Sequence, residues 1–247
     1  MSQTPILGYN GMLINPGESS EDSQRTALFA LVKEERLDEA MAYINRHPDP
    51  VKLLNIPNPE DKRTLIFIAA MLKYSQKSLE FSKFLIEKGA NVLQIDSYGQ
   101  TPVFFAAAEG NVELLRLLLE KGVKAEEEDG FKQTALFYAA REGHLEVVKC
   151  LVEFGANYDH LDQIKETPLF YAASQGKKDM CELLVSYGAN VNAVDDKKQT
   201  ALFFALKSNH IGVVEYLQSV GAIKTKDGRI LKAEILKSKS LLIRRHR

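Results

Sequence analysis

The chain has 247 residues, of which 45% are hydrophobic and 26% are charged, and its formal net charge is -1. This balance argues against a protein built as a whole to bind nucleic acid or an anionic membrane, and the longest apolar run, from Leu65 to Leu72, is far too short to span a bilayer. Cys150 and Cys181 cannot form a disulfide framework and match no zinc-site spacing, so we expect two buried thiols.

Residues 1–20 are predicted to be an N-terminal extension. They lack a cationic start followed by an apolar run, so we expect no secretory signal. Together with the expected thiols, this favours an intracellular location, in the cytoplasm, the nucleus or both.

From residue 21 onward, one phrase recurs along the chain. It begins at Thr26, Thr64, Thr101, Thr134, Thr167 and Thr200, at intervals of 38, 37, 33, 33 and 33 residues. Its clearest copies read QTPVFFAA, QTALFYAA, ETPLFYAA and QTALFFAL. A regular period of 33 residues indicates a stacked array of one small structural motif.

Each repeat is predicted to contain two short helices. Threonine followed by proline, at 101–102 and 167–168, is typical of a helix N-cap and first helical position. The second segment, for example HLEVVKCLVEFG, has apolar residues at three- and four-residue steps and ends at a glycine suited to the left-handed conformation. Polar stretches such as DSYGQ are expected to form projecting loops.

The first two repeats are expected to be irregular. The second carries an insertion near 74–78, which is predicted to lengthen its turn or its second helix. Prolines 48, 50, 57 and 59 predict an extended and irregular connection after the first repeat, which should cap the array. At the other end, ILKAEILKSKSLLI is predicted to form a closing helix.

The recurring threonine, proline, leucine, aromatic and paired-alanine phrase, with Gly-Ala-Asn at the repeat end, resembles the ankyrin repeat. The resemblance implies an all-α solenoid of stacked antiparallel helix pairs with projecting hairpin-like loops over residues 21–227. The predicted repeats are 21–58, 59–95, 96–128, 129–161, 162–194 and 195–227, followed by a basic capping helix and tail at 228–247.

One departure from the family concerns a histidine, which is understood to hydrogen-bond the loop backbone and tie repeats together. This chain instead has phenylalanine at that place in all six copies of the phrase, at Phe29, Phe67, Phe104, Phe137, Phe170 and Phe203. We therefore expect a different loop network.

The resemblance further implies a non-catalytic protein–protein interaction module, either a scaffold, an adaptor or an inhibitor, that binds a protein partner on a concave face. The sequence contains no glycine-rich phosphate loop, HExxH motif or nucleophile elbow, and its five histidines are dispersed. We expect no catalytic, cofactor-binding or metal-binding residues and no membrane partner, and we expect the protein to be a monomer.

Candidate partner-binding residues lie on the loop tips before each threonine and on the exposed end of each first helix. The loop set is Ser97, Tyr98, Gln100, Phe131, Gln133, Ile164, Glu166, Lys197 and Gln199, and the helix-end set is Glu109, Arg141, Glu142, Ser174, Gln175, Lys207 and Ser208. The large apolar tips are either anchors for a partner or folded back onto their own loops. A ladder, Phe105, Tyr138, Tyr171 and Phe204, either lines the binding groove or packs between first helices.

Residues 224–247 contain nine basic and two acidic side chains, a balance of +7. This segment is either a nuclear-import signal, a contact for an acidic partner or a solvated capping helix. The alternative functions are therefore a nuclear, chromatin or nucleic-acid-associated factor that uses the basic C-terminus, and a pathogen effector of the ankyrin type. The absence of interleaved aromatic residues argues against nucleic acid.

Overall fold

A computed structural model of the protein describes residues 6–7, 13–14 and 21–223. The chain divides into two compact units, unit 1 ending at Gly130 and unit 2 beginning at Phe131. Near the N-terminus, two short strands, β1 (Ile6–Leu7) and β2 (Leu13–Ile14), form an antiparallel pair. The other described elements are all α-helices, as expected.

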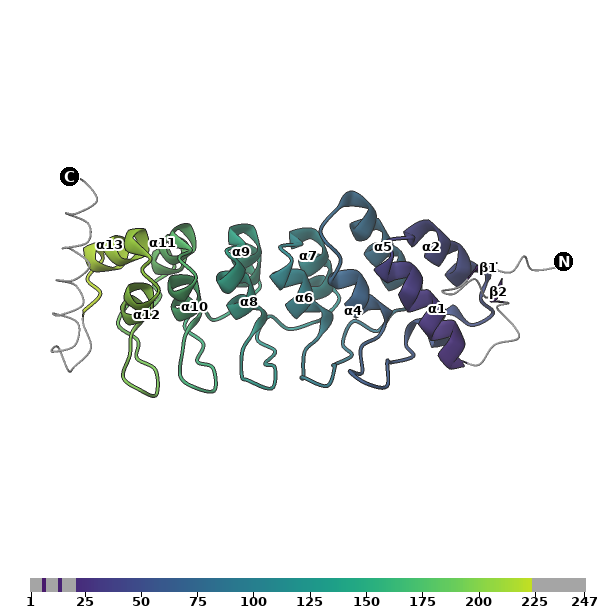
Figure 1. Cartoon of the computed structure of the whole chain (residues 1–247), viewed down its shortest axis with the longest axis horizontal. Coiled ribbons are helices and arrows are strands. Elements are labelled where there is room, and N and C mark those ends of the chain that lie inside the picture. The colour runs from purple at the N-terminus through teal and green to yellow at the C-terminus, as the bar shows by residue number, and fades with distance from the viewer. Residues whose placement is uncertain (1–5, 8–12, 15–20, 224–247) are drawn as a thin grey trace. The chain divides into compact units, whose positions relative to one another are not determined.

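Unit 1 contains three helix pairs and one additional short helix. The helices are α1 (Glu21–Lys33), α2 (Leu37–Arg46), α3 (Pro50–Leu54), α4 (Leu65–Ala70), α5 (Gln76–Glu87), α6 (Pro102–Ala108) and α7 (Val112–Glu120). The first helices α1, α4 and α6 pack in one layer, and α2, α5 and α7 pack behind them in a second (Figure 1).

Unit 2 also contains three helix pairs in two layers. Its helices are α8 (Ala135–Glu142), α9 (Leu145–Glu153), α10 (Pro168–Ser174), α11 (Lys178–Ser186), α12 (Ala201–Lys207) and α13 (Ile211–Ser219). Helix α10 packs between α8 and α12, and α11 packs between α9 and α13. The connections that lead into α10 and α12 project beyond the first-helix layer as long loops (Figure 1).

The predicted helix starts are confirmed from the second repeat onward, where Thr64, Thr101, Thr134, Thr167 and Thr200 are the N-cap residues. Only the Thr200 hydroxyl accepts a hydrogen bond from its helix, from the Phe203 amide at 3.4 Å. The other four hydroxyls are buried with no hydrogen-bond partner among the described residues. A phenylalanine three residues later offers no polar atom to them, whereas a histidine would.

The phenylalanines instead form the core between repeats. Phe67, Phe104, Phe137 and Phe170 are all buried, beside the equally buried alanine pairs of the first helices. The small alanines allow neighbouring helices to approach closely, and each buried aromatic ring contributes roughly 1.5–3 kcal/mol relative to an exposed one. The expected apolar interior is therefore present within each unit.

The irregular repeats differ in part from expectation. The proline-rich connection contains a helix, α3, because Pro50 occupies its first turn and Asp49 caps it by accepting a hydrogen bond from the Lys52 amide. Helix α1 begins at Glu21, so Thr26 lies inside the helix and does not cap it. The insertion lengthens both the turn after α4 and helix α5, which has 12 residues and a capping box between Ser75 and Ser78.

One glycine is required by a close approach between repeats. Gly176 has a positive φ of 71°, and a Cβ atom there would lie 2.6 Å from Nδ1 of His210. His210 starts α13, and its Nε2 lies 2.9 Å from the Ser174 carbonyl oxygen in the preceding repeat. This histidine thus has a structural contact, as expected from its position at a second-helix start.

Candidate functional site

The projecting loops are folded around buried aspartates. Oδ1 of Asp162 accepts hydrogen bonds from the amides of Ile164 and Glu166, at 3.0 and 2.9 Å. Asp96 and Asp195 bind their own loops in the same way, and all three carboxylates are buried. Because a side chain closes each turn, the loop conformation is fixed without help from the residues at its tip.

Neighbouring loops within a unit are joined by backbone hydrogen bonds. In unit 1, the Gly130 amide donates to the Tyr98 carbonyl oxygen at 2.8 Å. In unit 2, the amides of Gln163 and Asp196 donate to the carbonyl oxygens of Phe131 and Ile164, at 2.9 and 3.0 Å. These hydrogen bonds hold the backbones of the tip residues and use only main-chain atoms.

The three large apolar tips are exposed. Tyr98 is 55% exposed, Phe131 57% and Ile164 43%, so about half of each side chain is open to solvent. Sequence reasoning missed further exposed apolar residues on the same loops, namely Leu93 and Ile95 in unit 1 and Leu161 and Val194 in unit 2. A repeated sequence pattern could have identified three of them, because Ile95, Leu161 and Val194 each directly precede a loop aspartate.

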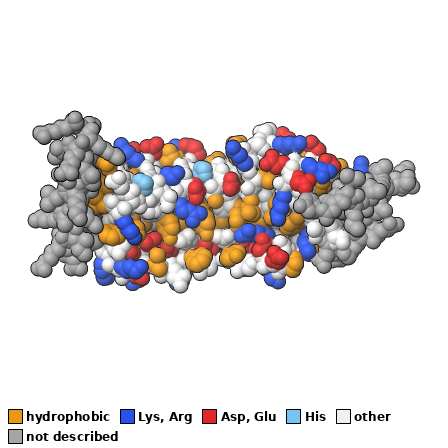
Figure 2. All heavy atoms as spheres, in the orientation of Figure 1, with side chains coloured by type: hydrophobic (Ala, Val, Ile, Leu, Met, Phe, Trp, Pro, Cys, Tyr) orange, Lys and Arg blue, Asp and Glu red, His pale blue; other side chains and the backbone are white. Residues whose placement is uncertain are grey.

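We define the exposed apolar loop residues as the loop-edge set, which is Leu93, Ile95 and Tyr98 in unit 1 and Phe131, Leu161, Ile164 and Val194 in unit 2. Figure 2 shows hydrophobic side chains interspersed with charged ones over the loop region. The charged neighbours include the predicted residue Lys197, which is exposed, as is the polar Ser97. Scattered apolar residues are normal on a protein surface, but here they recur at fixed loop positions.

The residues directly before each threonine are not free loop tips, as the sequence had suggested, but links between repeats. Gln100 is buried, and its Nε2 lies 3.4 Å from Oδ2 of Asp129 on the next loop. Gln133 makes the corresponding bond to Asp162 at 3.2 Å. Arg63, which the sequence did not single out, precedes Thr64 and forms a 2.9 Å salt bridge with the buried Asp96.

Glu166 occupies the same position in the fifth repeat, whereas Gln199, half-buried, occupies it in the sixth. Burial, and then the charges of Asp162 and Asp195, raise the pKa of the Glu166 carboxyl to about 7. Lys197 and the Tyr171 hydroxyl act in the opposite direction. Glu166 is therefore the one pre-threonine residue among the described repeats that places an acid beside an aspartate.

The aromatic ladder is half-buried and packs on the preceding repeat. The ring of Phe105 lies 5.9 Å from that of Phe67, and the ring of Tyr171 lies 5.5 Å from that of Phe137. Phe204 contacts Phe170 at 5.7 Å. These contacts correspond to packing between first helices, so the ladder has a structural role whether or not its exposed edges also meet a partner.

Tyr171 and Tyr138 also make polar or charged contacts. The Tyr171 hydroxyl donates to Asp162 Oδ2 at 2.8 Å and accepts from Gln133 Nε2 at 2.6 Å. Burial and this contact with Asp162 raise the pKa of the Tyr171 phenol. Tyr138 lies under the guanidinium of Arg141, 5.0 Å from the ring centre to Cζ.

The helix-end set lies mainly at the surface. Glu109, Glu142, Gln175, Lys207 and Ser208 are exposed, and Arg141 and Ser174 are half-buried. Arg141 also donates to Glu142 at 3.0 Å. The exposed members have side chains open to solvent, with Glu142 held by Arg141.

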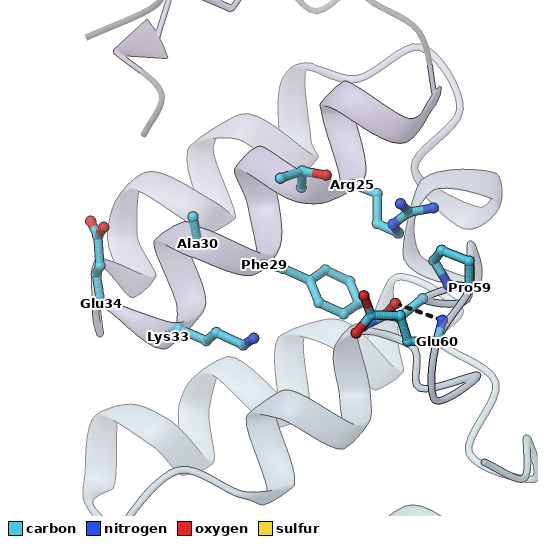
Figure 3. A pocket seen from close by; sticks show the side chains of 9 residues that line it. Arg25, Phe29, Ala30, Lys33, Glu34, Pro59 and Glu60 are labelled. Atoms are coloured by element: carbon cyan, nitrogen blue, oxygen red, sulfur yellow. Dashed lines mark hydrogen bonds between the residues drawn. The ribbon is translucent and has the colours of Figure 1, made fainter. Parts of the chain in front are cut away.

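Unit 1 has a pocket that sequence reasoning did not predict. It has a volume of about 510 Å³ and lies between α1 and the loop at 58–60. In Figure 3 the Phe29 ring points toward Pro59 and Glu60, with Arg25 and Lys33 at either side. The lining mixes both signs of charge with the aromatic ring of Phe29.

The described residues contain no group of three or more histidine, cysteine or acidic side chains that could hold a metal ion. Cys150 and Cys181 are buried and not joined in a disulfide, and burial, aided by the charge of Glu182, raises the pKa of the Cys181 thiol to about 12. A thiol with so high a pKa is a poor nucleophile.

Among residues 21–223, no helix is both long and apolar enough to cross a membrane. The predicted capping helix and basic tail at 228–247 lie outside the described residues, as does most of the predicted N-terminal extension. The alternative function that rests on the basic C-terminus therefore stays a prediction.

The repeated helix pairs and loops agree with a match to a family model described as "Ankyrin repeats (3 copies)", which covers residues 37–129 and 136–228. These two segments make up most of the chain. The chain therefore belongs to the ankyrin-repeat family, and the all-α repeat fold is confirmed. Ankyrin repeats generally mediate protein–protein interactions. No curated protein matched the chain.

Proposed function

We propose that this protein is a non-catalytic binding module that recognises another protein through its loop-edge set and the neighbouring helix ends. The observation that carries the proposal is the exposure of Tyr98, Phe131 and Ile164 on loops whose backbones are already held, by buried aspartates at Tyr98 and Ile164 and by a hydrogen bond from the next loop at Phe131. A preformed surface lowers the ordering cost of association, and exposed aromatic residues are the side chains that dominate interface energetics.

The loop tips can serve binding without a cost to folding. Each aspartate closes its turn by accepting backbone amides, and the carbonyl oxygens of Tyr98, Phe131 and Ile164 accept the amides that link neighbouring loops. The Tyr98 ring also lies 5.8 Å from Cζ of Arg63. Replacing a tip side chain should therefore leave the fold intact. This separation of folding from surface chemistry is what a binding module needs.

The test is affinity capture with the full chain, followed by measurement of dissociation constants for each captured protein. In unit 2, the double variant Phe131→Ser/Ile164→Ser is compared with Val220→Ser, which changes an exposed apolar residue at the end of α13. In unit 1, Tyr98→Ser is compared with Tyr74→Ser, which changes an exposed tyrosine on the α4–α5 turn.

We expect at least one loop variant to weaken binding about 30-fold, which corresponds to about 2 kcal/mol, while its control binds as the wild type does. Circular dichroism should be unchanged in all four variants. If both loop variants keep every partner at wild-type affinity, the proposed surface is wrong. If the wild-type chain captures no protein specifically, the proposed function itself is wrong.

A further inference from the structure

The loops before α10 and α12 are joined by a backbone hydrogen bond, but the residue before Thr167 is not a side-chain donor as its counterparts in other repeats are. Arg63 and Gln133 each donate to Oδ2 of the aspartate on the following loop, at 2.9 and 3.2 Å. In the fifth repeat the donor position is taken by Glu166, and the corresponding aspartate is Asp195. When both are ionised, two negative charges replace a hydrogen bond.

Asp195 is held in place by its own loop. It is 3% exposed, and its Oδ1 accepts the amides of Lys197 and Gln199 at 2.9 and 2.7 Å. Glu166 accepts no backbone amide among the described residues, so its carboxyl is the group that can supply a donor to this contact.

We propose that Glu166 is a proton-binding position which, when protonated, donates to Asp195 and so completes the loop contact as Gln133 does beside Asp162. Protonation removes the repulsion and restores the missing donor at the same time. Unit 2 is then more stable against unfolding when Glu166 is protonated than when it is ionised.

The charged and titratable groups around Glu166 act in both directions, and those that favour the protonated form outweigh the others. Asp162 from its own loop and Asp195 from the next loop favour the protonated form, as does burial, while Lys197 and the Tyr171 hydroxyl favour the ionised form. The net effect raises the pKa of Glu166 from 4.5 to about 7. Since the folded-state pKa is the higher one, the stabilisation is fully present below about 4.5 and is lost as the pH rises through about 7.

The first experiment follows the side-chain carboxyl carbon of Glu166 by NMR in the full chain between pH 4 and pH 9. A titration midpoint near 7 is expected, far above the ordinary value of 4.5. A midpoint below about 5 would overturn the proposal. This measurement uses the wild-type protein and does not depend on any variant folding.

The second experiment measures the urea unfolding midpoint of the full chain at pH 5.5 and pH 8. Glu166→Gln should raise the unfolding midpoint relative to the wild type at pH 8, and it should remove most of the loss that the wild type shows between the two pH values. The matched control is Asp196→Asn, which removes an exposed charge from the neighbouring loop and should leave the wild-type pH profile unchanged.

The converse variant, Gln133→Glu, places the same acid beside Asp162 and should add a second pH-dependent loss of stability to unit 2. The proposal is wrong if Glu166→Gln retains the wild-type difference between pH 5.5 and pH 8. It is equally wrong if Asp196→Asn abolishes that difference, because a general charge effect would then explain it.

Discussion

Two loop contacts, one before α6 in unit 1 and one before α12 in unit 2, are built on an aspartate at the equivalent position, Asp96 and Asp195. The residue that the preceding repeat places beside this aspartate has opposite charge in the two contacts. Arg63 forms a salt bridge with Asp96, and its guanidinium lies 4.6 Å from the ring centre of Phe105. Glu166 brings an acid to Asp195. The loop shape is nevertheless the same, because Oδ1 closes the turn in both cases.

The difference shows that the two oxygens of the loop aspartate have separate roles. Oδ1 determines the local turn, whereas the partner of Oδ2 determines how strongly one repeat is tied to the next. According to the proposal for Glu166, the single position directly before the threonine sets the strength and the pH dependence of the contact. Four groups of variants compare the two units, in order of decreasing expected effect, and the second group tests the role of Oδ2 directly.

Removing a buried phenylalanine from the core of either unit should have the largest effect on the free energy of unfolding. Phe67→Ala in unit 1 and Phe170→Ala in unit 2 each delete a ring that is at most 2% exposed. Each should lower the free energy of unfolding by about 3–5 kcal/mol, as measured by urea denaturation. Ile164→Ala, at an exposed tip, should change it by less than about 0.5 kcal/mol. A loss below 1 kcal/mol for both phenylalanines would contradict the assigned core.

Breaking the Arg63–Asp96 pair should have the next largest effect. Arg63→Met leaves a buried carboxylate without its cation and should cost about 3 kcal/mol in the same measurement. Arg63→Gln supplies the amide donor used by Gln133 and should recover a substantial part of that loss. Equal losses for methionine and glutamine would show that Oδ2 needs no donor.

The threonine hydroxyls with and without a hydrogen-bond partner predict stability effects of opposite sign. Thr134→Val replaces a buried hydroxyl that has no hydrogen-bond partner and should stabilise unit 2 by about 1 kcal/mol. Thr200→Val removes the hydroxyl that caps α12 and should destabilise by about 1 kcal/mol. Thermal unfolding of the two variants side by side checks the signs, and a loss in Thr134→Val would mean that its hydroxyl has a role.

The smallest expected effect concerns the loop backbone. Lys165 has a φ of 65°, in the left-handed region, where the corresponding residue of the unit 1 loop is Gly99, with a φ of 77°. Lys165→Gly should stabilise by about 0.5 kcal/mol, since strain relief exceeds the entropy cost, and Gly99→Lys should destabilise by a similar amount. Differential scanning calorimetry should resolve both changes, and the same sign for both would contradict this account.

The sequence predicted the parts of the fold that depend on local chemistry. Thr167 followed by Pro168 starts a helix wherever it occurs, and Gly155 closes one by adopting a positive φ of 88°. Helix α3 was not predicted, because prolines indicate both irregular chain and helix first turns, and the Asp49 cap decided between them. Such residues are hardest to interpret in the first repeat, where the regular sequence pattern is incomplete.

The candidate site was predicted less completely, because its geometry depends on contacts between repeats. The exposure of Tyr98 and Phe131 followed from their places at loop tips. The role of Gln100 did not, because a glutamine before a threonine looks like a surface residue until the next loop brings Asp129 beside it. The pocket beside Phe29 likewise requires two segments about 30 residues apart in sequence.

The buried thiols of unit 2 provide a measure of its motion. Cys150 on α9 and Cys181 on α11 lie in the second-helix layer, and a reagent in solution reaches neither sulfur while the layer is closed. Alkylation at neutral pH therefore proceeds only through transient separation of these helices. The rate of covalent labelling would report how readily those helices separate, without an engineered residue.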